Sequence, residues 1–192
     1  MRIISTAVAV FERLCANMPW FFELYAFPYR ALVARELQLA GVRASDTVLS
    51  IGCGALPFTA VLTARISGAR VIGVDRDRKS ALRARRTVAR LGLQADVTIL
   101  EADAASDRLP AADVALVALQ AAPKPEILRN LSRSHAGCDG GRIVFRLPRA
   151  RLAAEYGTLD STAQPAAGMV RHLMPTFGRS ELHLVSGAGS RV

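Results

Sequence analysis

Short apolar runs alternate with helical stretches from residue 46 onward. The runs are rich in β-branched residues and bounded by turn residues, which is typical of buried strands. Five of them cover 47–51, 69–74, 97–100, 113–119 and 142–147. The stretches with helical spacing cover 57–66, 77–91, 126–135 and 149–156. This alternation predicts an α/β domain with a Rossmann-like, mostly parallel sheet flanked by helices.

The two ends of the chain differ from this pattern. Before residue 46 we expect two helices, 3–17 and 29–39, joined by the aromatic segment 20–29. Because this part is too short for a separate core, we interpret 1–45 as a helical cap on one globular unit, 46–192. Near the other end, 169–185 predicts two strands around the turn 175–178, forming an antiparallel edge of the sheet.

Length and cysteine usage favour a single domain in a reducing compartment. The chain has 192 residues and three cysteines far apart in sequence, with no histidine at metal-ligand spacing, so neither a disulfide framework nor a metal site is expected. The apolar run at 3–10 lacks a following cleavage site, and no uninterrupted apolar run is long enough for a membrane span. We therefore expect a soluble, cytoplasmic protein.

The formal charge of +9 raises the question of nucleic acid. Only Lys79 and Lys124 are lysines, and the many arginines accompany abundant alanine, which indicates compositional drift more than a designed basic patch. Five basic residues at helical spacing form one basic stripe: Arg76, Lys79, Arg83, Arg86 and Arg90. The favoured interpretation of this stripe is the solvated face of a helix. An RNA methyltransferase stays open through this stripe, although the segment 119–123 lacks the motif that would support it. The sequence disfavours a nucleic-acid partner and does not indicate an oligomeric state.

A glycine turn followed by an acidic residue is the strongest chemical signal. Gly52, Cys53 and Gly54 directly follow the first predicted strand, and Asp75 ends the second, 21 residues after Gly54. Glycines there let the backbone approach a ligand at a helix N-terminus, and a carboxylate there accepts hydrogen bonds from ribose hydroxyls. The order of strand, turn, helix, strand and acid predicts a nucleoside site.

The position of Pro57 decides between nucleosides. A dinucleotide fold has a third glycine there, so that helix and strand pack closely around a pyrophosphate. NAD is therefore the second choice, and S-adenosylmethionine (SAM), which has no pyrophosphate, is the first. Asp103, just after the third strand, is placed to accept from an adenine amino group; alternatively, it caps the next turn.

Residues 46–186 resemble the class I SAM-dependent methyltransferases. The resemblance implies that Gly52 and Gly54 contact the methionine part, that Asp75 holds the ribose and that Asp103 reaches the adenine. Ser50 stands where the family usually has an acidic residue. The predicted cofactor contacts are Ser50, Gly52, Cys53, Gly54, Pro57, Asp75, Arg76, Asp103, Ala104 and Leu119.

The form Ile-Gly-x-Gly-x-Leu-Pro-x-Thr at 51–59 is similar to the nicotianamine synthase group. The segments 25–36 and 171–176 are loosely similar to that group as well. In nicotianamine synthases the nucleophile attacks Cγ of the aminocarboxypropyl arm of SAM, not the methyl group, and methylthioadenosine is left. The resemblance therefore implies Cγ chemistry, in which positioning supplies about 7–11 kcal/mol.

Tyr25, Tyr29 and Tyr156 are the candidate catalytic residues, because an aromatic face stabilises a sulfonium and a hydroxyl orients a carboxylate or amine. Packing of the cap onto the sheet is the alternative role for this aromatic segment. Glu23 and Glu36 are candidate bases, although glutamates on helices are more often solvated. Three histidines are isolated in sequence; of them, only His172 lies near the expected edge of the site.

Three functions stay open at this point. The first is Cγ chemistry, either cyclisation of SAM itself or aminocarboxypropyl transfer to a small amine, because the short cap leaves room only for a small substrate. The second is an ordinary small-molecule methyltransferase. The third is a protein that binds SAM or nucleic acid without turnover. The fold cannot choose among them, since function depends on the site.

Overall fold

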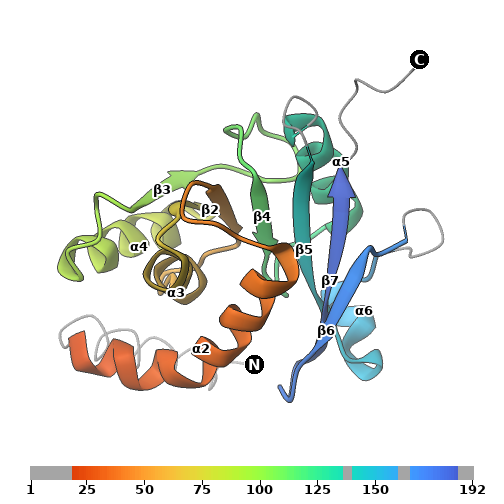
Figure 1. Ribbon diagram of the computed structural model, residues 1–192, viewed down its shortest axis with the longest axis horizontal. Helices are drawn as coiled ribbons and strands as arrows, with labels where there is room; N and C mark the ends of the chain where they lie inside the picture. The colour runs from red at the N-terminus through yellow and green to blue at the C-terminus, as the bar shows by residue number, and fades with distance from the viewer. Residues whose placement is uncertain (1–18, 136–139, 160–164, 186–192) are drawn as a thin grey trace.

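The computed structural model describes residues 19–135, 140–159 and 165–185, and within them seven strands form one sheet (Figure 1). The strand order is β3-β2-β1-β4-β5-β7-β6. The strands are β1 (Thr47–Ile51), β2 (Arg70–Asp75), β3 (Val97–Glu101), β4 (Val114–Val117), β5 (Gly141–Pro148), β6 (Gly168–Arg171) and β7 (Phe177–Val185). This is the predicted Rossmann-like methyltransferase arrangement.

The central strands are parallel, and the last two are antiparallel. β1 lies between β2 and β4, and β5 extends the parallel set beyond β4. All four residues of β4 are buried, because helices cover both faces of a parallel sheet. β7 runs antiparallel to both β5 and β6, which confirms the antiparallel edge predicted from 169–185.

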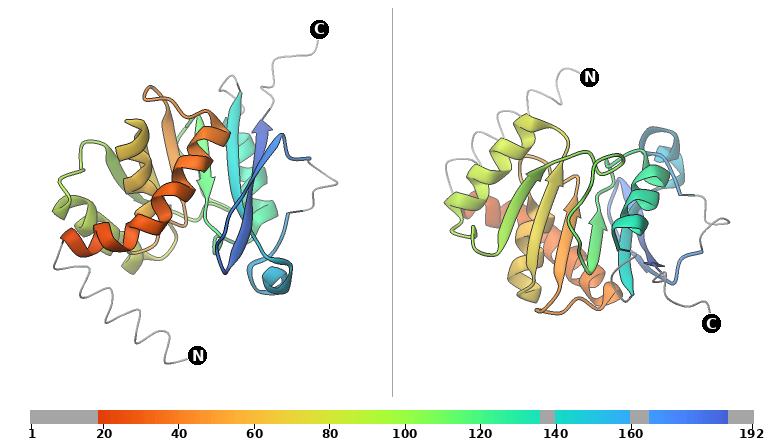
Figure 2. Two further views of the ribbon diagram at one scale, coloured as in Figure 1. Left: turned by 60° about the horizontal axis from the view of Figure 1, so that its bottom comes forward. Right: turned by 90° about the horizontal axis from the view of Figure 1, so that it is seen from above.

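Helices cover the sheet on both faces. The helices are α2 (Pro19–Ala40), α3 (Phe58–Ser67), α4 (Arg78–Arg90), α5 (Lys124–His135) and α6 (Ala153–Tyr156), with a 3₁₀ turn at Ala150–Leu152. Buried residues of α2, α3 and α4 share one apolar cluster with Val48 and Val71, whereas those of α5 share the other with Leu49 and Ile143. Figure 2 shows α5 on the face opposite to α2 and α3. No helix in these described ranges is both long and apolar enough to cross a membrane.

The aromatic segment predicted as a connection is part of a helix, so that prediction is wrong. α2 runs without interruption from Pro19 to Ala40 and contains Pro28. An internal proline costs a helix one backbone hydrogen bond, but Phe22 and Ala26 are each only 1% exposed. Their burial against the core stabilises the continuous helix. The helix predicted over 3–17 lies outside the described residues.

Capping residues set the starts of the two helices nearest the glycine turn. Pro57 occupies the N-cap position of α3 and does not begin the helix itself. Asp77 caps α4 by accepting from the backbone N–H of Ser80, so α4 begins at Arg78. Arg76 therefore precedes the helix and does not belong to the basic stripe, whose remaining members are exposed along α4: Lys79, Arg83, Arg86 and Arg90.

Candidate functional site

The strand order places a crevice at the carboxyl end of β1. The chain leaves β1 toward β2 on one side, whereas β4 pairs with β1 on the other side. Open α/β sheets bind ligands at such a switch point, beyond the carboxyl ends of the strands. The glycine turn after β1 lies at this position.

The glycine turn has a backbone that suits glycine. Gly52 and Gly54 have φ angles of 72° and 67°, which side chains rarely adopt. The N–H groups of Gly52 and Cys53 both donate to the carbonyl of Val74, at 2.8 and 3.1 Å. A Cβ on Gly54 would meet no atom within 4 Å, so the space beside it is open.

The Asp75 carboxylate organises the turn. Its Oδ2 accepts from the backbone N–H of Gly54 at 2.7 Å, and its Oδ1 accepts from that of Asp77 at 2.9 Å. A carboxylate has about four lone-pair sites, so both oxygens can still accept from a ligand. Asp75 thus joins the glycine turn to the start of α4.

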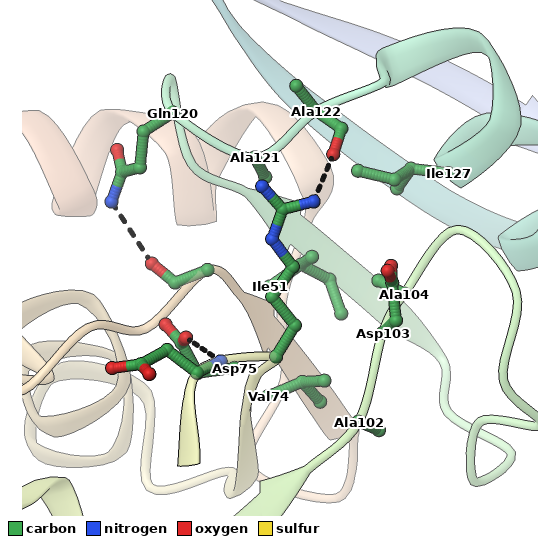
Figure 3. A pocket seen from close by; sticks show the side chains of 13 residues that line it. Ile51, Val74, Asp75, Ala102, Asp103, Ala104, Gln120, Ala121, Ala122 and Ile127 are labelled. Carbon is green, nitrogen blue, oxygen red and sulfur yellow. Dashed lines mark hydrogen bonds between the residues drawn. The ribbon is translucent and has the colours of Figure 1, made fainter. Parts of the chain in front are cut away.

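A cavity of about 190 Å³ opens between the ends of β1, β2, β3 and β4 (Figure 3). In Figure 3, Val74 and Asp75 approach from β2, Asp103 from the segment after β3, and Gln120 from the loop after β4. The lining residues are Ile51, Gly52, Val74, Asp75, Arg76, Asp77, Ala102, Asp103, Ala104, Gln120, Ala121, Ala122 and Ile127. Five of the ten predicted cofactor contacts line it: Gly52, Asp75, Arg76, Asp103 and Ala104.

Asp103 caps its own loop and also lines the cavity. Its Oδ1 accepts from the backbone N–H of Ala105 at 2.9 Å, and its own N–H donates to Asp107 at 2.8 Å. The capping role weighed from the sequence is therefore present. The carboxylate retains acceptor sites on the cavity wall, so recognition of an adenine amino group stays a prediction.

Two hydrogen bonds connect opposite sides of the cavity. Arg76 Nη1 donates to the carbonyl of Ala122 at 3.3 Å. Gln120 Nε2 donates to the carbonyl of Gly52 at 3.2 Å, as the dashed line in Figure 3 shows. The loop after β4 is thereby tied both to the end of β2 and to the glycine turn.

The other five predicted cofactor contacts are not among the residues that line the cavity. Ser50 is 2% exposed within β1, and Leu119 is 7% exposed after β4. Gly54 and the buried Pro57 lie between β1 and α3. Burial and, to a smaller extent, the charge of Asp75 together raise the pKa of the Cys53 thiol to about 12. Cys53 is therefore a protonated, packed side chain and not a nucleophile.

Two of the three predicted tyrosines lie against one apolar cluster. Tyr29 and Tyr156 are half-buried, and both pack against the cluster beneath α2 and α3. The Tyr29 ring is stacked on Phe58, the first residue of α3, with centroids 5.9 Å apart. The side chain of Tyr25 lies outside the described residues, as does that of Glu23. The catalytic role of all three tyrosines stays a prediction.

Glu36 is neither a solvated helix residue nor a free base. It is completely buried and forms a two-point ion pair with Arg146 of β5, at 2.8 and 2.6 Å. Arg146 also donates to Thr59 Oγ1 at 3.0 Å, and Ser180 donates to Glu36 at 2.7 Å. Burial opposes the charge of Arg146, but the adjacent Glu36 carboxylate raises its pKa above the ordinary value. The interpretation of Glu36 as a solvated glutamate is therefore wrong, because β5 supplies a buried partner.

His172 joins this buried network and does not line the cavity. Its Nε2 lies 2.9 Å from Ser180 Oγ and 3.9 Å from Glu36. Burial lowers the pKa of His172, so the ring is neutral at pH 7. His172 therefore helps fasten the edge strands to α2.

In the loop after β4 only Leu119 was predicted from the sequence, and the loop residues that line the cavity were not. Gln120, Ala121 and Ala122 line the cavity, and Ile127 of α5 lies beside them. The signal that reveals them is positional, since this loop follows the strand on the far side of the switch point. Lys124, a buried lysine behind this loop, was also missed.

The residues around the cavity fit SAM. The space beside Gly54 is open where the sequence predicts the methionine part, and Asp75 lines the cavity where the sequence predicts a ribose contact; both contacts stay predictions. The apolar Ala102 and Ile127 offer faces for an adenine, and Asp103 offers an acceptor. Among the described residues, no group of three or more His, Cys, Asp or Glu side chains is arranged to hold a metal ion.

Comparison with known proteins agrees with this geometry. Residues 48–137 match the methyltransferase domain family. The L-histidine 2-aminobutanoyltransferase of Yersinia pestis is 34% identical over 77 residues, which are 40% of this chain and 29% of that protein. The chain thus matches less than a third of that curated relative.

Solved structures extend the match over nearly the whole chain. A mutant of MtNAS in complex with SAM has a TM-score of 0.79 and 24% identity, over 93% of this chain and 71% of that one. A second structure of the same mutant has a TM-score of 0.77 and 26% identity, over 92% of this chain and 69% of that one. An RNA methyltransferase from Salinibacter ruber, in complex with S-adenosylhomocysteine, has a TM-score of 0.62 and 19% identity, over 84% and 95%.

The chain has the class I methyltransferase fold, and its residues 48–137 match the methyltransferase domain family. Solved structures with the same fold include MtNAS.

Proposed function

We propose that the enzyme acts at Cγ of SAM and releases methylthioadenosine. One observation carries the proposal: the residues of the Leu-Pro-Phe-Thr segment connect the glycine turn to the α2 cap. Phe58 packs between Phe22 and Tyr29 of α2, with ring centroids at 4.7 and 5.9 Å. Thr59 of α3 accepts a hydrogen bond from Arg146, and Arg146 is paired with Glu36 of α2.

We expect this connection to bring the half-buried rings of Tyr29 and Phe58 near the glycine turn, which is predicted to face the methionine part. Aromatic faces attract cations such as a sulfonium, and a closed apolar surface excludes water. Both effects favour a reaction that depends on holding the methionine arm in one conformation. The packing of α2 on this segment supports a role for the cap in positioning that arm, and so it favours Cγ chemistry over methyl transfer.

The names of two similar proteins also support attack at Cγ of SAM. The Yersinia pestis protein is an L-histidine 2-aminobutanoyltransferase, and MtNAS has been crystallised with MTA and tNA. Methylthioadenosine, abbreviated MTA, is the by-product that attack at Cγ leaves. These names describe those proteins, and their chemistry is part of the proposal for this chain.

The reaction forms one bond at Cγ and breaks one bond there. A nucleophile donates its electron pair to Cγ, the Cγ–S bond breaks, and its pair returns to sulfur as the neutral thioether. An attacking amine loses one N–H proton to water, and an attacking α-carbon loses its C–H proton to water. If the nucleophile is an external amine, the product is an aminocarboxypropyl adduct; if it is the amine or α-carbon of SAM itself, the product is a small cyclic amino acid.

Tyr29 and Tyr156 are the residues proposed to orient the arm, because both pack against the same apolar cluster and Tyr29 stacks on Phe58, which follows the glycine turn. We expect Tyr29→Phe or Tyr156→Phe to lower turnover more than SAM affinity, since a hydroxyl that orients the reacting arm matters most in the transition state. Steady-state rates and calorimetric affinities, measured on the same preparations, separate the two effects.

Product analysis of purified protein tests the proposal. SAM is incubated alone and then with small amino acids and amines, and the nucleoside products are separated by chromatography. Methylthioadenosine from SAM alone, faster than its spontaneous breakdown, supports cyclisation; methylthioadenosine only with an amine supports aminocarboxypropyl transfer. S-adenosylhomocysteine as the sole product overturns the proposal in favour of methyl transfer.

A further inference from the structure

Lys124 is a buried cation whose partners are all backbone carbonyls. It begins α5 and is 1% exposed. Its Nζ donates to the carbonyls of Leu119 at 2.7 Å, Ala121 at 3.1 Å and Tyr156 at 2.7 Å. An ammonium has three N–H donors, so these three acceptors use all of them.

Of the three acceptors, Ala121 lines the cavity and Leu119 lies in the same loop, next to the lining residue Gln120. The carbonyls of Leu119 and Ala121 flank Gln120, which lines the cavity and donates to Gly52 at 3.2 Å. Lys124 therefore fixes the backbone on both sides of the residue that connects this loop to the glycine turn. The loop has no regular secondary structure between β4 and α5, so such bonds set its conformation.

The third acceptor lies on a different element. Tyr156 ends α6, which follows β5 rather than β4. The Lys124–Tyr156 bond, at 2.7 Å, therefore links the cofactor wall to the segment that carries a proposed substrate-orienting tyrosine. The two segments are 32 residues apart in sequence, so this contact depends on the fold.

We infer that Lys124 is a positioning residue that holds the β4–α5 loop against the SAM cavity and couples this loop to α6. The SAM part of the inference rests on the cofactor site, and the Tyr156 part rests on the proposed function. An arginine would not substitute, because its planar fork cannot direct three donors to three carbonyls around one point. The chain's other lysine, Lys79, is exposed on α4 and serves as the matched control.

The protonation of Lys124 provides a readout of this role. Burial lowers its pKa to about 8 from 10.5. Above that pH the neutral amine has two N–H donors for three carbonyls, so one bond is lost. The charged side chains on the surrounding elements are Glu126 and Arg129 of α5, Glu155 next to Tyr156, and Arg76 at Ala122; burial is the cause of the shift.

SAM affinity and folding stability should change in opposite directions when Lys124 loses its proton. Loss of the third bond loosens the loop, so SAM affinity should fall as the pH rises through about 8. The folded pKa lies below the unfolded one, so the unfolded chain binds more protons between about pH 8 and 10.5. Lys124 therefore makes folding stability rise with pH across that window. A residue that only supports the fold would change stability without changing SAM affinity in this way.

Calorimetric titration of SAM into the wild type, Lys124→Met and Lys79→Met, from about pH 7 to about pH 9, tests the inference. At the lower pH we expect Lys124→Met to bind about tenfold more weakly than the other two. The wild type and Lys79→Met should then lose affinity with rising pH, relative to Lys124→Met. Equal affinity of the three proteins, or three parallel pH profiles, would overturn the inference.

Hydrogen exchange on the wild-type protein without SAM gives a second test that needs no variant. Amides of residues 119–122 should exchange faster than the intrinsic pH effect predicts as the pH passes about 8, whereas those of β1 should not. Uniform behaviour of the two segments would overturn the inference even if Lys124→Met fails to fold. Neither measurement depends on which SAM carbon reacts, so failure of the Cγ proposal is distinguishable from failure of this one.

Discussion

The Asp75 carboxylate accepts a hydrogen bond from the backbone N–H of Gly54 at 2.7 Å. The residue predicted to hold the ribose thus also holds the turn predicted to hold the methionine part. One side chain therefore sets the distance between the two halves of the cofactor site. This relationship makes Asp75 a sensitive point for SAM binding.

We expect Asp75→Ala to weaken SAM binding by about 1.5–3 kcal/mol, or roughly 10- to 150-fold, as for loss of a charge-assisted hydrogen bond. Isothermal titration calorimetry measures the change. Asp96→Ala, an exposed aspartate in the turn between α4 and β3, is the matched control and should bind normally. Affinity of Asp75→Ala within twofold of the wild type would remove Asp75 from the site.

Gly54→Val should abolish SAM binding while the domain stays folded. The added side chain enters the open space beside the turn, where the methionine part is expected to lie. Gly92→Val is a close control, because Gly92 has a φ of 68° and equally open surroundings, but lies at the end of α4. Both variants should show similar losses in melting temperature, and only Gly54→Val should lose binding. Normal binding by Gly54→Val would mean that the turn does not face the cofactor.

Removing one partner of the Glu36–Arg146 pair should strongly destabilise the fold. Glu36→Gln leaves the Arg146 guanidinium buried without its counter-charge, at an expected cost of about 3–5 kcal/mol in the free energy of unfolding. Glu36→Leu combined with Arg146→Met should recover much of this loss. The exposed Glu126–Arg129 pair is the control, and Glu126→Gln should cost below about 1 kcal/mol. Urea unfolding that shows equal losses for Glu36→Gln and Glu126→Gln would contradict the buried pair.

Acidification below the ordinary histidine pKa should destabilise the protein through His172 and His183. Burial lowers the pKa of both rings, so the unfolded chain binds more protons than the folded chain as the pH falls below 6.5. Stability is therefore full above that value and is lost as the pH falls toward the folded pKa values. In urea unfolding between about pH 5 and pH 7, combining His172→Gln with His183→Leu should flatten this dependence. If the double variant keeps the same dependence of unfolding free energy on pH, other titratable groups cause that dependence.

The glycine turn shows what local sequence is able to predict. The turn, Asp75 and the alternation of strands and helices are encoded within short windows, and the sheet and its antiparallel edge were predicted from them. The cavity residues after β4 are different, because they approach the glycine turn only through strand pairing between β1 and β4. Strand order is a tertiary property that periodicity does not contain.

The sequence-based expectations that the structure contradicts fail for one physical reason, which is contact between residues far apart in the chain. Glu36 is separated from Arg146 by 110 residues, so no local pattern reveals that it is buried and paired. The segment around Pro28 favours a break by propensity, but burial of Phe22 stabilises a continuous helix. Lys124 resembles a surface lysine in sequence, and its three carbonyl partners appear only when α6 returns to the loop after β4. In each case tertiary contacts outweigh local preference.

We propose that the bond between sulfur and Cγ of SAM is the one that breaks. SAM labelled with ¹³C in its S-methyl group tests this proposal, with the products followed by NMR. We expect the label to stay on methylthioadenosine and the amino-acid product to be unlabelled. Transfer of the label to an acceptor, with unlabelled S-adenosylhomocysteine as the nucleoside product, would contradict cleavage at Cγ.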